Sequence, residues 1–293
     1  MKHALIIGCG YVGTALARQL LADGWKVSGV VASKSSAQEL VSYGIHARIA
    51  DCRTEQGART ACAEPADLVV YAVSSGGGDY RSNYLEGMRW VLKALEKHPP
   101  RGMIYTGSAS VYAQTGGEWV TEESPANPAN ENGMILRETE SLLLETVRNR
   151  FPSTVLRLSG IYGHGRHHLL DELRLKKKAL SIQPDGIINR IFREDIVRAI
   201  QVIFTHLERG SAPEILNVTD DEPSINREVV QWLCQRLGRE VPSFDIASSA
   251  EMTKRGSLSR NACRRISNAR MKSLGWKPSC PSYREGFEGI LSL

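Results

Sequence analysis

Short apolar runs alternate along the first 160 residues with longer stretches in which apolar side chains recur every three or four positions. A short continuous apolar run is typical of a strand covered on both faces, and the wider spacing is typical of an amphipathic helix. The pattern predicts strands at 5–7, 25–31, 45–50, 67–73, 102–106 and 154–158, and helices at 12–21, 35–43, 80–97 and 133–150. Strands that alternate with helices predict an α/β fold built on a doubly wound parallel sheet.

The rest of the chain is less regular. A polar, proline-bearing loop is expected at 113–132, a second loop at 160–166, and a basic helix at 168–179. Beyond these we expect a helix to about 207, a strand at 215–218, a helix capped by Ser224 that ends near 237, and a short helix ending at 274. We interpret residues 161–293 as a smaller substrate-binding region that closes over the C-terminal edge of a sheet domain formed by residues 1–160.

The first strand leads into a G-x-G-x-x-G motif that opens a helix. Gly8 permits a sharp turn, Gly10 lets the backbone approach a pyrophosphate, and Gly13 permits close packing of the helix on the strand. Tyr11 and Val12 lie at the start of this helix, whose N-terminus would direct unpaired N–H groups at the phosphates. The motif predicts a Rossmann-type dinucleotide-binding domain, with a purely structural glycine turn as the alternative.

The end of the second strand bears on the choice of dinucleotide. A site specific for NAD usually has a carboxylate there, which binds the ribose hydroxyls. This chain has Ser33 and Lys34 instead, and a hydroxyl and a cation suit a 2′-phosphate. We therefore expect NADP as the cofactor, with NAD as the second choice. The alternative role for Ser33 is to cap the next helix.

Further strand ends extend this candidate site. Asp51 follows the third strand, where an acid would lie near the adenine or cap the following helix. Ala72 and Val73 end the fourth strand, and Ser74 begins a flexible stretch beside the expected cofactor. Ligands of doubly wound sheets bind beyond the carboxyl ends of the strands, so these positions belong to one predicted site.

Composition and charge narrow the class of protein. The 293 residues are 42% hydrophobic and 24% charged, as in ordinary globular chains. The six cysteines form no C-x-x-C pair, which favours reduced thiols over disulfides or zinc. With no signal peptide and no apolar run long enough to span a membrane, we expect a cytoplasmic protein that does not bind membranes.

The net charge of +5 comes entirely from the second half of the chain. Residues 1–160 carry 16 basic and 16 acidic side chains, whereas residues 161–293 carry 21 and 16. A basic second half suits a small anionic substrate, or it aids solubility. The lysine run at 176–178 has no aromatic residues among it, so nucleic acid is not an expected partner. We expect a monomer or a homodimer.

Several segments together resemble the extended short-chain dehydrogenase/reductase superfamily. They are the glycine motif, an S-x-x-V-Y element at 108–112, the segment at 156–166 after the sixth strand, and the strand-to-helix segment at 189–196. The ending S-N-A-R at 267–270 with L-G-W at 274–276 is most similar to an atypical group, the NAD(P)-dependent epimerase/dehydratase-like proteins. The resemblance implies a nicotinamide cofactor and often a nucleotide-sugar substrate.

The chain departs from that superfamily at its catalytic pair, Y-x-x-x-K. Ser108 matches the serine that polarises the substrate in the family. The family spacing puts the tyrosine position at Gly133 or Met134 and the lysine position at Arg137. Neither Gly133 nor Met134 can carry a proton, whereas Arg137 could still bind ribose hydroxyls.

Replacements for the missing proton carrier are expected near the same cleft. Tyr162 has a phenol, and His164, His167 and His168 follow it closely. The alternative for Tyr162 is to pack at the edge of the cofactor. The three histidines lack a fourth ligand at a characteristic spacing, so no metal site is expected.

Substrate contacts are expected from Ser74, Arg166 and Arg190. The Arg166 guanidinium suits bidentate contact with a substrate phosphate, and a surface salt bridge is the alternative.

Two functions follow. The first is an NAD(P)-dependent oxidoreductase or epimerase/dehydratase-like enzyme, with Ser108, Tyr162 and Arg137 as candidate catalytic residues. Its substrate would be small and either nucleotide-sugar-like or anionic, with a carbonyl or hydroxyl at the reacting carbon. The alternative is a catalytically silent protein that binds NADP(H) as a signal.

Overall fold

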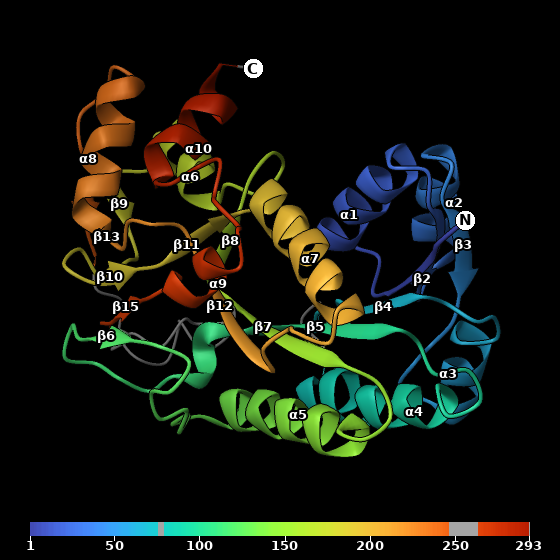
Figure 1. Ribbon diagram of the computed structural model, residues 1–293. Helices are drawn as coiled ribbons and strands as arrows, with labels where there is room; N and C mark the ends of the chain where they lie inside the picture. Colours follow the sequence, from blue (N-terminus) through green and yellow to red (C-terminus); the bar gives the residue numbers. More distant parts are fainter. Residues whose placement is uncertain (76–78, 246–262, 293) are drawn as a thin grey trace.

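A seven-stranded parallel sheet organises the computed structural model, which describes residues 1–75, 79–245 and 263–292 (Figure 1). The strand order is β12-β7-β5-β4-β1-β2-β3. In chain order the strands are β1 (His3–Ile7), β2 (Lys26–Val31), β3 (His46–Ile49), β4 (Leu68–Tyr71), β5 (Gly102–Ser108), β7 (Ser153–Leu158) and β12 (Ile215–Val218). The order reverses between β1 and β4, which is the switch point where doubly wound sheets bind ligands. The α/β fold class is therefore confirmed.

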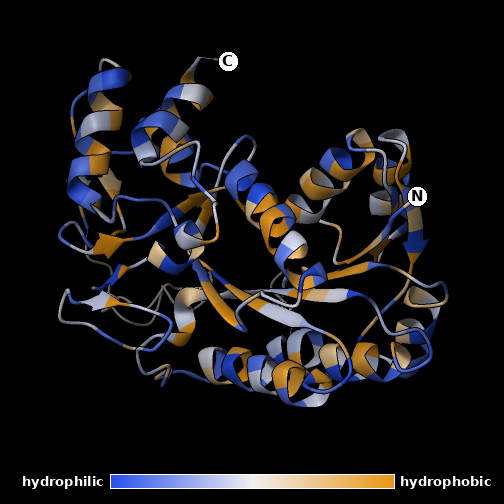
Figure 2. Cartoon of the chain, in the orientation of Figure 1, coloured by the Kyte–Doolittle hydropathy of each residue, from blue (hydrophilic) through white to orange (hydrophobic). Residues whose placement is uncertain are grey.

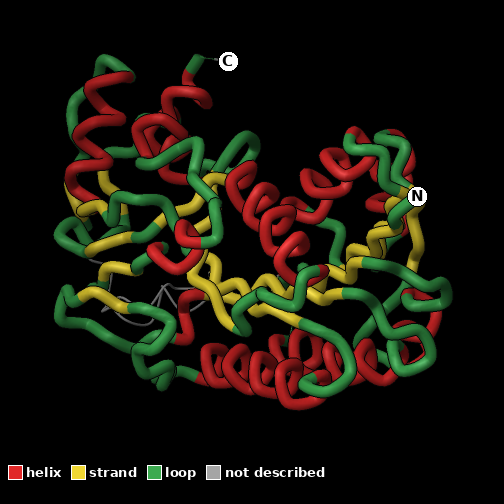
Figure 3. The backbone as a smooth tube through the Cα atoms, viewed as in Figure 1, coloured by secondary structure: helices red, strands yellow, loops and turns green. Residues whose placement is uncertain are grey.

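Helices cover both faces of this sheet (Figure 3). Alternate strand residues point to opposite faces, so Ala4 and Ile6 join one hydrophobic core while Leu5 and Ile7 join the other. The first core includes residues of α1 (Tyr11–Ala22), α2 (Lys34–Ser42) and α7 (Arg193–Glu208). The second includes residues of α3 (Glu55–Ala61), α4 (Gly87–Ala94) and α5 (Glu131–Val147). Figure 2 shows hydrophobic and hydrophilic residues alternating around these helices, as amphipathic packing requires.

A third core holds the smaller region together. It packs residues of α6 (His168–Arg174), α8 (Asn226–Arg236) and α10 (Tyr283–Leu291) around Tyr162 and Phe192. Four two-stranded ladders complete it: β8 (Gly160–Tyr162) with β11 (Arg190–Phe192), β10 (Ile187–Ile188) with β13 (Ser224–Ile225), β9 (Ala179–Leu180) with β14 (Ser243–Phe244), and β6 (Trp119–Val120) with β15 (Arg265–Ile266).

The sheet draws on residues beyond the boundary expected at 160. α7 packs on the same face as α1, and β12 extends the sheet beside β7. Met271, in α9 (Ala269–Ser273), and Trp276 return to this core, and the Trp276 indole donates to the Asp195 carbonyl at 3.1 Å. The chain therefore leaves the sheet after β7, builds part of the smaller region, and comes back twice.

Several predicted elements need correction. Ser224 does not cap a helix, since it lies in β13 and Ile225 precedes α8. α5 begins at Glu131 rather than 133 because the Asn130 side chain accepts from the Gly133 N–H at 2.8 Å. α6 ends at Arg174, and the loops predicted at 113–132 and 160–166 contain the short strands β6 and β8.

Two further differences concern helices. The helix predicted at 80–97 opens with a π-helical segment, Arg81–Glu86, before α4. The helix α10 was not predicted, although its Ser282-x-x-Glu285 capping box is a recognisable start signal.

Within the described ranges, none of the helices combines the length and apolar character needed to cross a bilayer.

Candidate active site

The glycine motif forms a tight cradle at the sheet's switch point. Gly8 has φ +83°, and a Cβ at this residue would lie 2.6 Å from the backbone N and Cα of Val73. At Gly13 a Cβ would lie 3.0 Å from the Gly8 carbonyl oxygen, so helix and strand are in close contact. At Gly10 a Cβ would meet nothing within 4 Å. The motif is closed where the backbone packs and open where a ligand would lie.

This cradle fits the diphosphate of a nicotinamide dinucleotide. Gly10 occupies the N-cap of α1 and offers no side chain to its first turn. The N–H groups at Tyr11, Val12 and Gly13 have no acceptor within the helix because of their position in its first turn. Phosphate oxygens beside Gly10 would supply those acceptors and would meet the positive end of the helix dipole.

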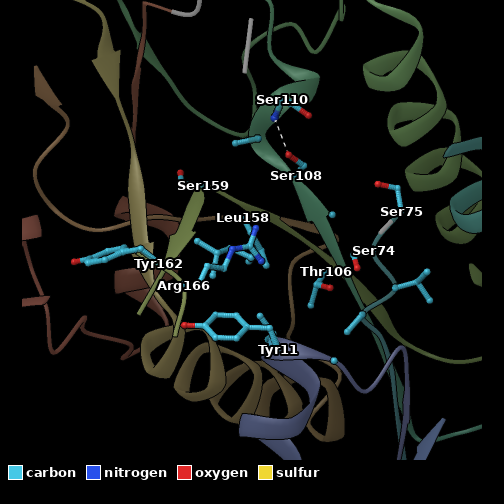
Figure 4. Close-up of a pocket in the computed structure, with 18 of the residues that line it drawn as sticks. Tyr11, Ser74, Ser75, Thr106, Ser108, Ser110, Leu158, Ser159, Tyr162 and Arg166 are labelled. Atoms are coloured by element: carbon cyan, nitrogen blue, oxygen red, sulfur yellow. Dashed lines mark hydrogen bonds between the residues drawn. The ribbon is translucent and has the colours of Figure 1, made fainter. Parts of the chain in front are cut away.

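One cavity of about 1410 Å³ connects the cradle with the smaller region (Figure 4). Its volume exceeds that of a usual single-ligand pocket, so it can hold a dinucleotide and a second molecule. The sequence-predicted residues that line it are Gly8, Gly10, Tyr11, Val12, Asp51, Ala72, Val73, Ser74, Ser108, Tyr162, Arg166, His167, His168 and Arg190. Gly13, Ser33, Lys34 and Arg137 are outside its wall.

The end of β2 carries the two residues that were considered for contact with the cofactor ribose, Ser33 and Lys34. Ser33 caps α2, since its Oγ accepts from the Ser36 N–H at 3.2 Å. Lys34 is exposed, while Ala32 and Ser36 line the cavity. The capping role is therefore present, and a cation stands beside it.

Asp51 lies at the end of β3 but does not cap α3, because Thr54 does so. The Asp51 carboxylate instead accepts from Arg53 Nε at 2.8 Å and from a terminal guanidinium nitrogen of Arg53 at 2.7 Å. These hydrogen bonds hold the pKa of Asp51 below its usual range. Asp51 is therefore an ionised carboxylate at the cavity wall whose charge is balanced by Arg53.

Ser108 stands at the end of β5 with its hydroxyl in the cavity. Its Oγ accepts from the Ser110 N–H at 3.2 Å, which leaves the hydroxyl proton free to donate (Figure 4). A ligand carbonyl or hydroxyl in the cavity could accept this proton.

Of the two positions predicted for the superfamily tyrosine, Gly133 has no room for a side chain, and Met134 carries an exposed one. A Cβ at Gly133 would lie 2.5 Å from Pro128 Cβ and 3.4 Å from the Ser110 carbonyl oxygen. Arg137, one turn further along α5, donates to Ser141 Oγ at 3.0 Å and lies 3.5 Å from a Glu140 carboxylate oxygen. Its guanidinium is engaged along its own helix.

Tyr162 is buried, and its hydroxyl points away from Ser108 (Figure 4). The hydroxyl donates to the Ser282 carbonyl at 3.3 Å, and the ring packs on Phe192 and Phe287. Burial raises the pKa of Tyr162 far above its ordinary value. The phenol is therefore held by the third core, and whether it also meets the edge of a cofactor stays a prediction.

The three histidines after Tyr162 do not gather around one point. His167 pairs with Asp171 at 2.8 Å, and the His164 ring lies 6.0 Å from that of Phe192. Across the described parts of the chain, no three His, Cys, Asp or Glu side chains converge as metal ligands would. All six cysteines are free thiols.

Arg190 lines the cavity from below the surface. It is buried, donates to Ser224 Oγ at 2.9 Å, and has its pKa lowered to about 10 by burial. Asp220 is also buried, and its charge acts to raise the pKa of Arg190. Neither carboxylate oxygen of Asp220 has a hydrogen-bond partner among the described residues. Arg190 is therefore a buried cation at the floor of the cavity.

Three further polar residues of the cavity wall, Tyr84, Ser159 and Arg264, were not among the predicted site residues. Arg264 is buried and donates to the carbonyls of Ala109 at 3.2 Å and Gln114 at 3.4 Å, while its Nε has no partner in the described structure. Ser159 Oγ is likewise buried without a partner. Tyr84 faces the same cavity, and burial raises its pKa to about 12.

One of the three had a signal in the sequence. Ser159 follows a strand end just as Ser74 and Ser108 do, and could have been found by that rule. Arg264 and Tyr84 carry no such signal, since folding alone brings them to Ser108's cavity.

Comparison with known proteins agrees with this geometry. The NAD dependent epimerase/dehydratase family matches residues 4–219. Protein YeeZ of Escherichia coli (strain K12) is 28% identical over 255 residues, which cover 83% of this chain and 87% of YeeZ.

Solved structures agree as well. A protein described as an NAD-dependent epimerase/dehydratase from Methylobacillus flagellatus superposes with a TM-score of 0.80 at 28% identity, over 99% of this chain and 97% of that one. A dTDP-glucose 4,6-dehydratase from Bacillus anthracis, solved in complex with NAD, shares the fold with a TM-score of 0.82 at 17% identity, over 100% and 96% of the two chains. Since the glycine cradle, the parallel sheet and the family match agree, the chain belongs to the NAD-dependent epimerase/dehydratase family.

Proposed function

We propose that this protein is an NAD(P)-dependent enzyme of the epimerase/dehydratase or reductase type. It would act on a small nucleotide-sugar-like or anionic substrate with a carbonyl or hydroxyl at the reacting carbon. The observation that carries the proposal is the single cavity in which Ser108 opens onto the same space as the dinucleotide cradle. The NAD complex of the Bacillus anthracis dTDP-glucose 4,6-dehydratase, which has the same fold, supports this assignment.

The chain's own residues supply binding and polarisation. The nicotinamide of a dinucleotide whose diphosphate lies in the cradle would supply the hydride donor or acceptor. Ser108 would donate its hydroxyl proton to the substrate oxygen and so stabilise developing negative charge there. Arg264 Nε and Ser159 Oγ, both buried without partners in the described structure, would bind an anionic or polar group of the substrate.

The proton carrier is a separate part of the proposal. Tyr162 has its hydroxyl committed to Ser282, so it is the weaker candidate. Tyr84 is a phenol in the cavity wall and, like any phenol with a pKa of 10 or higher, it is protonated at neutral pH. We therefore expect Tyr84→Phe to lower turnover more than Tyr162→Phe does, when both variants are measured with the same substrate.

NADP is the proposed cofactor, with NAD as the second choice. Support comes from the absence of a carboxylate at the end of β2 and from the exposed cation of Lys34 beside the cap. Dissociation constants for NADPH and NADH, measured on the same preparation, test this choice. Tighter binding of NADH would refute it, and Lys34→Ala should weaken NADPH binding alone.

A silent, cofactor-binding protein is the second candidate. The observation that favours it is the close approach of Pro128 to Gly133, which leaves no room for a tyrosine side chain at that position. Such a protein would bind the dinucleotide as a signal and present the smaller region to a partner.

Single-turnover oxidation of bound NADPH, with a panel of nucleotide sugars and carbonyl compounds, separates the two. The enzyme predicts consumption with at least one compound, and the matched variant Ser108→Ala should slow it by about 100-fold, as loss of a stabilising donor does. Tight NADPH binding with no consumption by any compound would favour the sensor.

A further inference from the structure

Two arginines contact the ring of Tyr11, one from the loop at 163–166 and one from the first residue of α7. The Arg193 guanidinium carbon lies 4.6 Å from the ring centroid and that of Arg166 lies 5.6 Å from it. The Tyr11 hydroxyl donates to the His164 carbonyl at 2.9 Å. Gly163 permits this approach, because a Cβ there would lie 2.8 Å from the Tyr11 oxygen. Tyr11 therefore ties the first turn of α1 to the loop at 163–166.

The two arginines differ in what else they touch. Arg193 is paired with Glu194, whose carboxylate oxygen lies 2.9 Å from its Nε, and it does not line the cavity. Arg166 lines the cavity and is directed into it above Tyr11 (Figure 4). No acidic side chain of the described residues forms an ion pair with Arg166. One cation on this ring is neutralised, and the other faces the cradle.

We infer that Arg166 binds the diphosphate of the dinucleotide, and not the substrate as the sequence suggested. Its guanidinium lies over the ring of Tyr11, the first residue of α1, and lines the same cavity as Gly10 and Val12. Stacking on Tyr11 leaves the edge of the guanidinium free to donate, and this planar fork matches two phosphate oxygens. The inference rests on the proposed function, because it needs a dinucleotide in the cradle.

This assignment also explains why the loop at 163–166 is tied to the glycine motif. The loop leads from β8 into α6, which lines the substrate end of the cavity. A phosphate contact from Arg166 makes cofactor affinity depend on the smaller region. The bound dinucleotide would in turn hold the loop in position before a substrate enters.

Binding measurements on the full-length chain test the inference without any substrate. NADPH and NADH are titrated by nicotinamide fluorescence, and ADP-ribose and AMP by calorimetry, with wild type, Arg166→Ala and Arg166→Lys. We expect Arg166→Ala to weaken NADPH, NADH and ADP-ribose by about tenfold, one charge-assisted contact at a solvent-accessible site. AMP, which lacks the second phosphate, should lose less than about twofold, and the lysine variant should be intermediate because it keeps charge without the fork.

Arg193→Ala is the matched control, since it removes the other cation from the same ring. It should leave all four affinities within about twofold of wild type, with melting temperatures confirming that each variant is folded. Unchanged dinucleotide affinity in Arg166→Ala overturns the inference and returns Arg166 to the substrate. Equal losses in both arginine variants, or an equal loss for AMP, overturn it as well. If wild type binds none of the dinucleotides, the proposed function itself fails.

Discussion

Two buried arginines show how differently the sheet and the smaller region use charge. Arg157, in β7, is almost fully buried and donates to both carboxylate oxygens of Glu140 at 2.9 and 2.7 Å, and to the Tyr112 hydroxyl at 2.9 Å. Arg190, in β11, donates to Ser224, while the nearby Asp220 carboxylate accepts from no described residue. The hydrogen bonds between Arg157 and Glu140 are complete without a ligand. Beside Arg190, the Asp220 carboxylate is left without a hydrogen bond.

The difference between the two arginines shows which part of the fold has polar groups available to a ligand. A fully hydrogen-bonded ion pair fixes α5 against β7 and so holds the end of β5 with Ser108 in place. Unpaired polar atoms lie instead around the cavity and the smaller region, at Ser159, Asp220 and Arg264. Groups left without partners by the fold are available to a ligand, at some expense in stability.

The largest expected effect is the loss of the complete pair. Arg157→Met should lower the free energy of unfolding by about 3–5 kcal/mol, because it leaves the Glu140 carboxylate buried without its partner. Urea denaturation measures the change. The double variant Arg157→Met with Glu140→Leu should recover most of the loss. If the single variant were as stable as wild type, the Arg157–Glu140 pair would not be what holds α5 against β7.

The glycine cradle comes next. Gly8→Ala should cost about 2–4 kcal/mol, because it combines a positive φ with a Cβ against the Val73 backbone. Gly10→Ala is the comparison variant, and it should cost less stability than Gly8→Ala because its Cβ would enter open space. Gly10→Ala should nevertheless weaken NADPH binding by about tenfold, since that space is reserved for the phosphates. Equal NADPH affinity in wild type and Gly10→Ala would contradict the cradle.

A substitution at Gly133 tests whether this position of the candidate site can accept a side chain. Gly133→Ala should destabilise by about 1–3 kcal/mol, since its Cβ meets Pro128 at 2.5 Å. Adding Pro128→Gly should relieve part of the strain, and thermal melting measures both. A fully stable Gly133→Ala would show that this position can accept a side chain after all.

The smallest effect is expected at Asp220, and it depends on pH. Burial raises the pKa of Asp220 well above its unfolded value of about 3.9, so the folded protein binds more protons between the two values. The free energy of unfolding should therefore fall as pH rises from about 4 through this window. Asp220→Asn should remove that slope and change stability at pH 5 by less than about 1 kcal/mol. Parallel slopes for the two proteins would show that Asp220 does not titrate in this window.

The sequence predicted the sheet better than the smaller region, for a physical reason. Strands buried on both faces read as apolar runs, so β1, β2 and β4 were found within a few residues of their ends. The strands β6 and β13 are too short, at two residues each, to show a periodicity, and their pairing partners lie far along the chain. Ser224 was wrongly predicted to cap a helix for the same reason, as its hydroxyl serves Arg190 instead.

The sequence by itself determined the glycine motif, the α/β alternation, the family resemblance and the loss of the catalytic tyrosine, because each is written in residue types at short spacings. Only the tertiary structure decided that Tyr162 faces Ser282, that Arg264 reaches the cavity of Ser108, and that Arg166 lies above Tyr11. Each of these joins segments more than 100 residues apart. Such contacts depend on how packed elements meet in space, which local patterns of apolar and polar residues do not record.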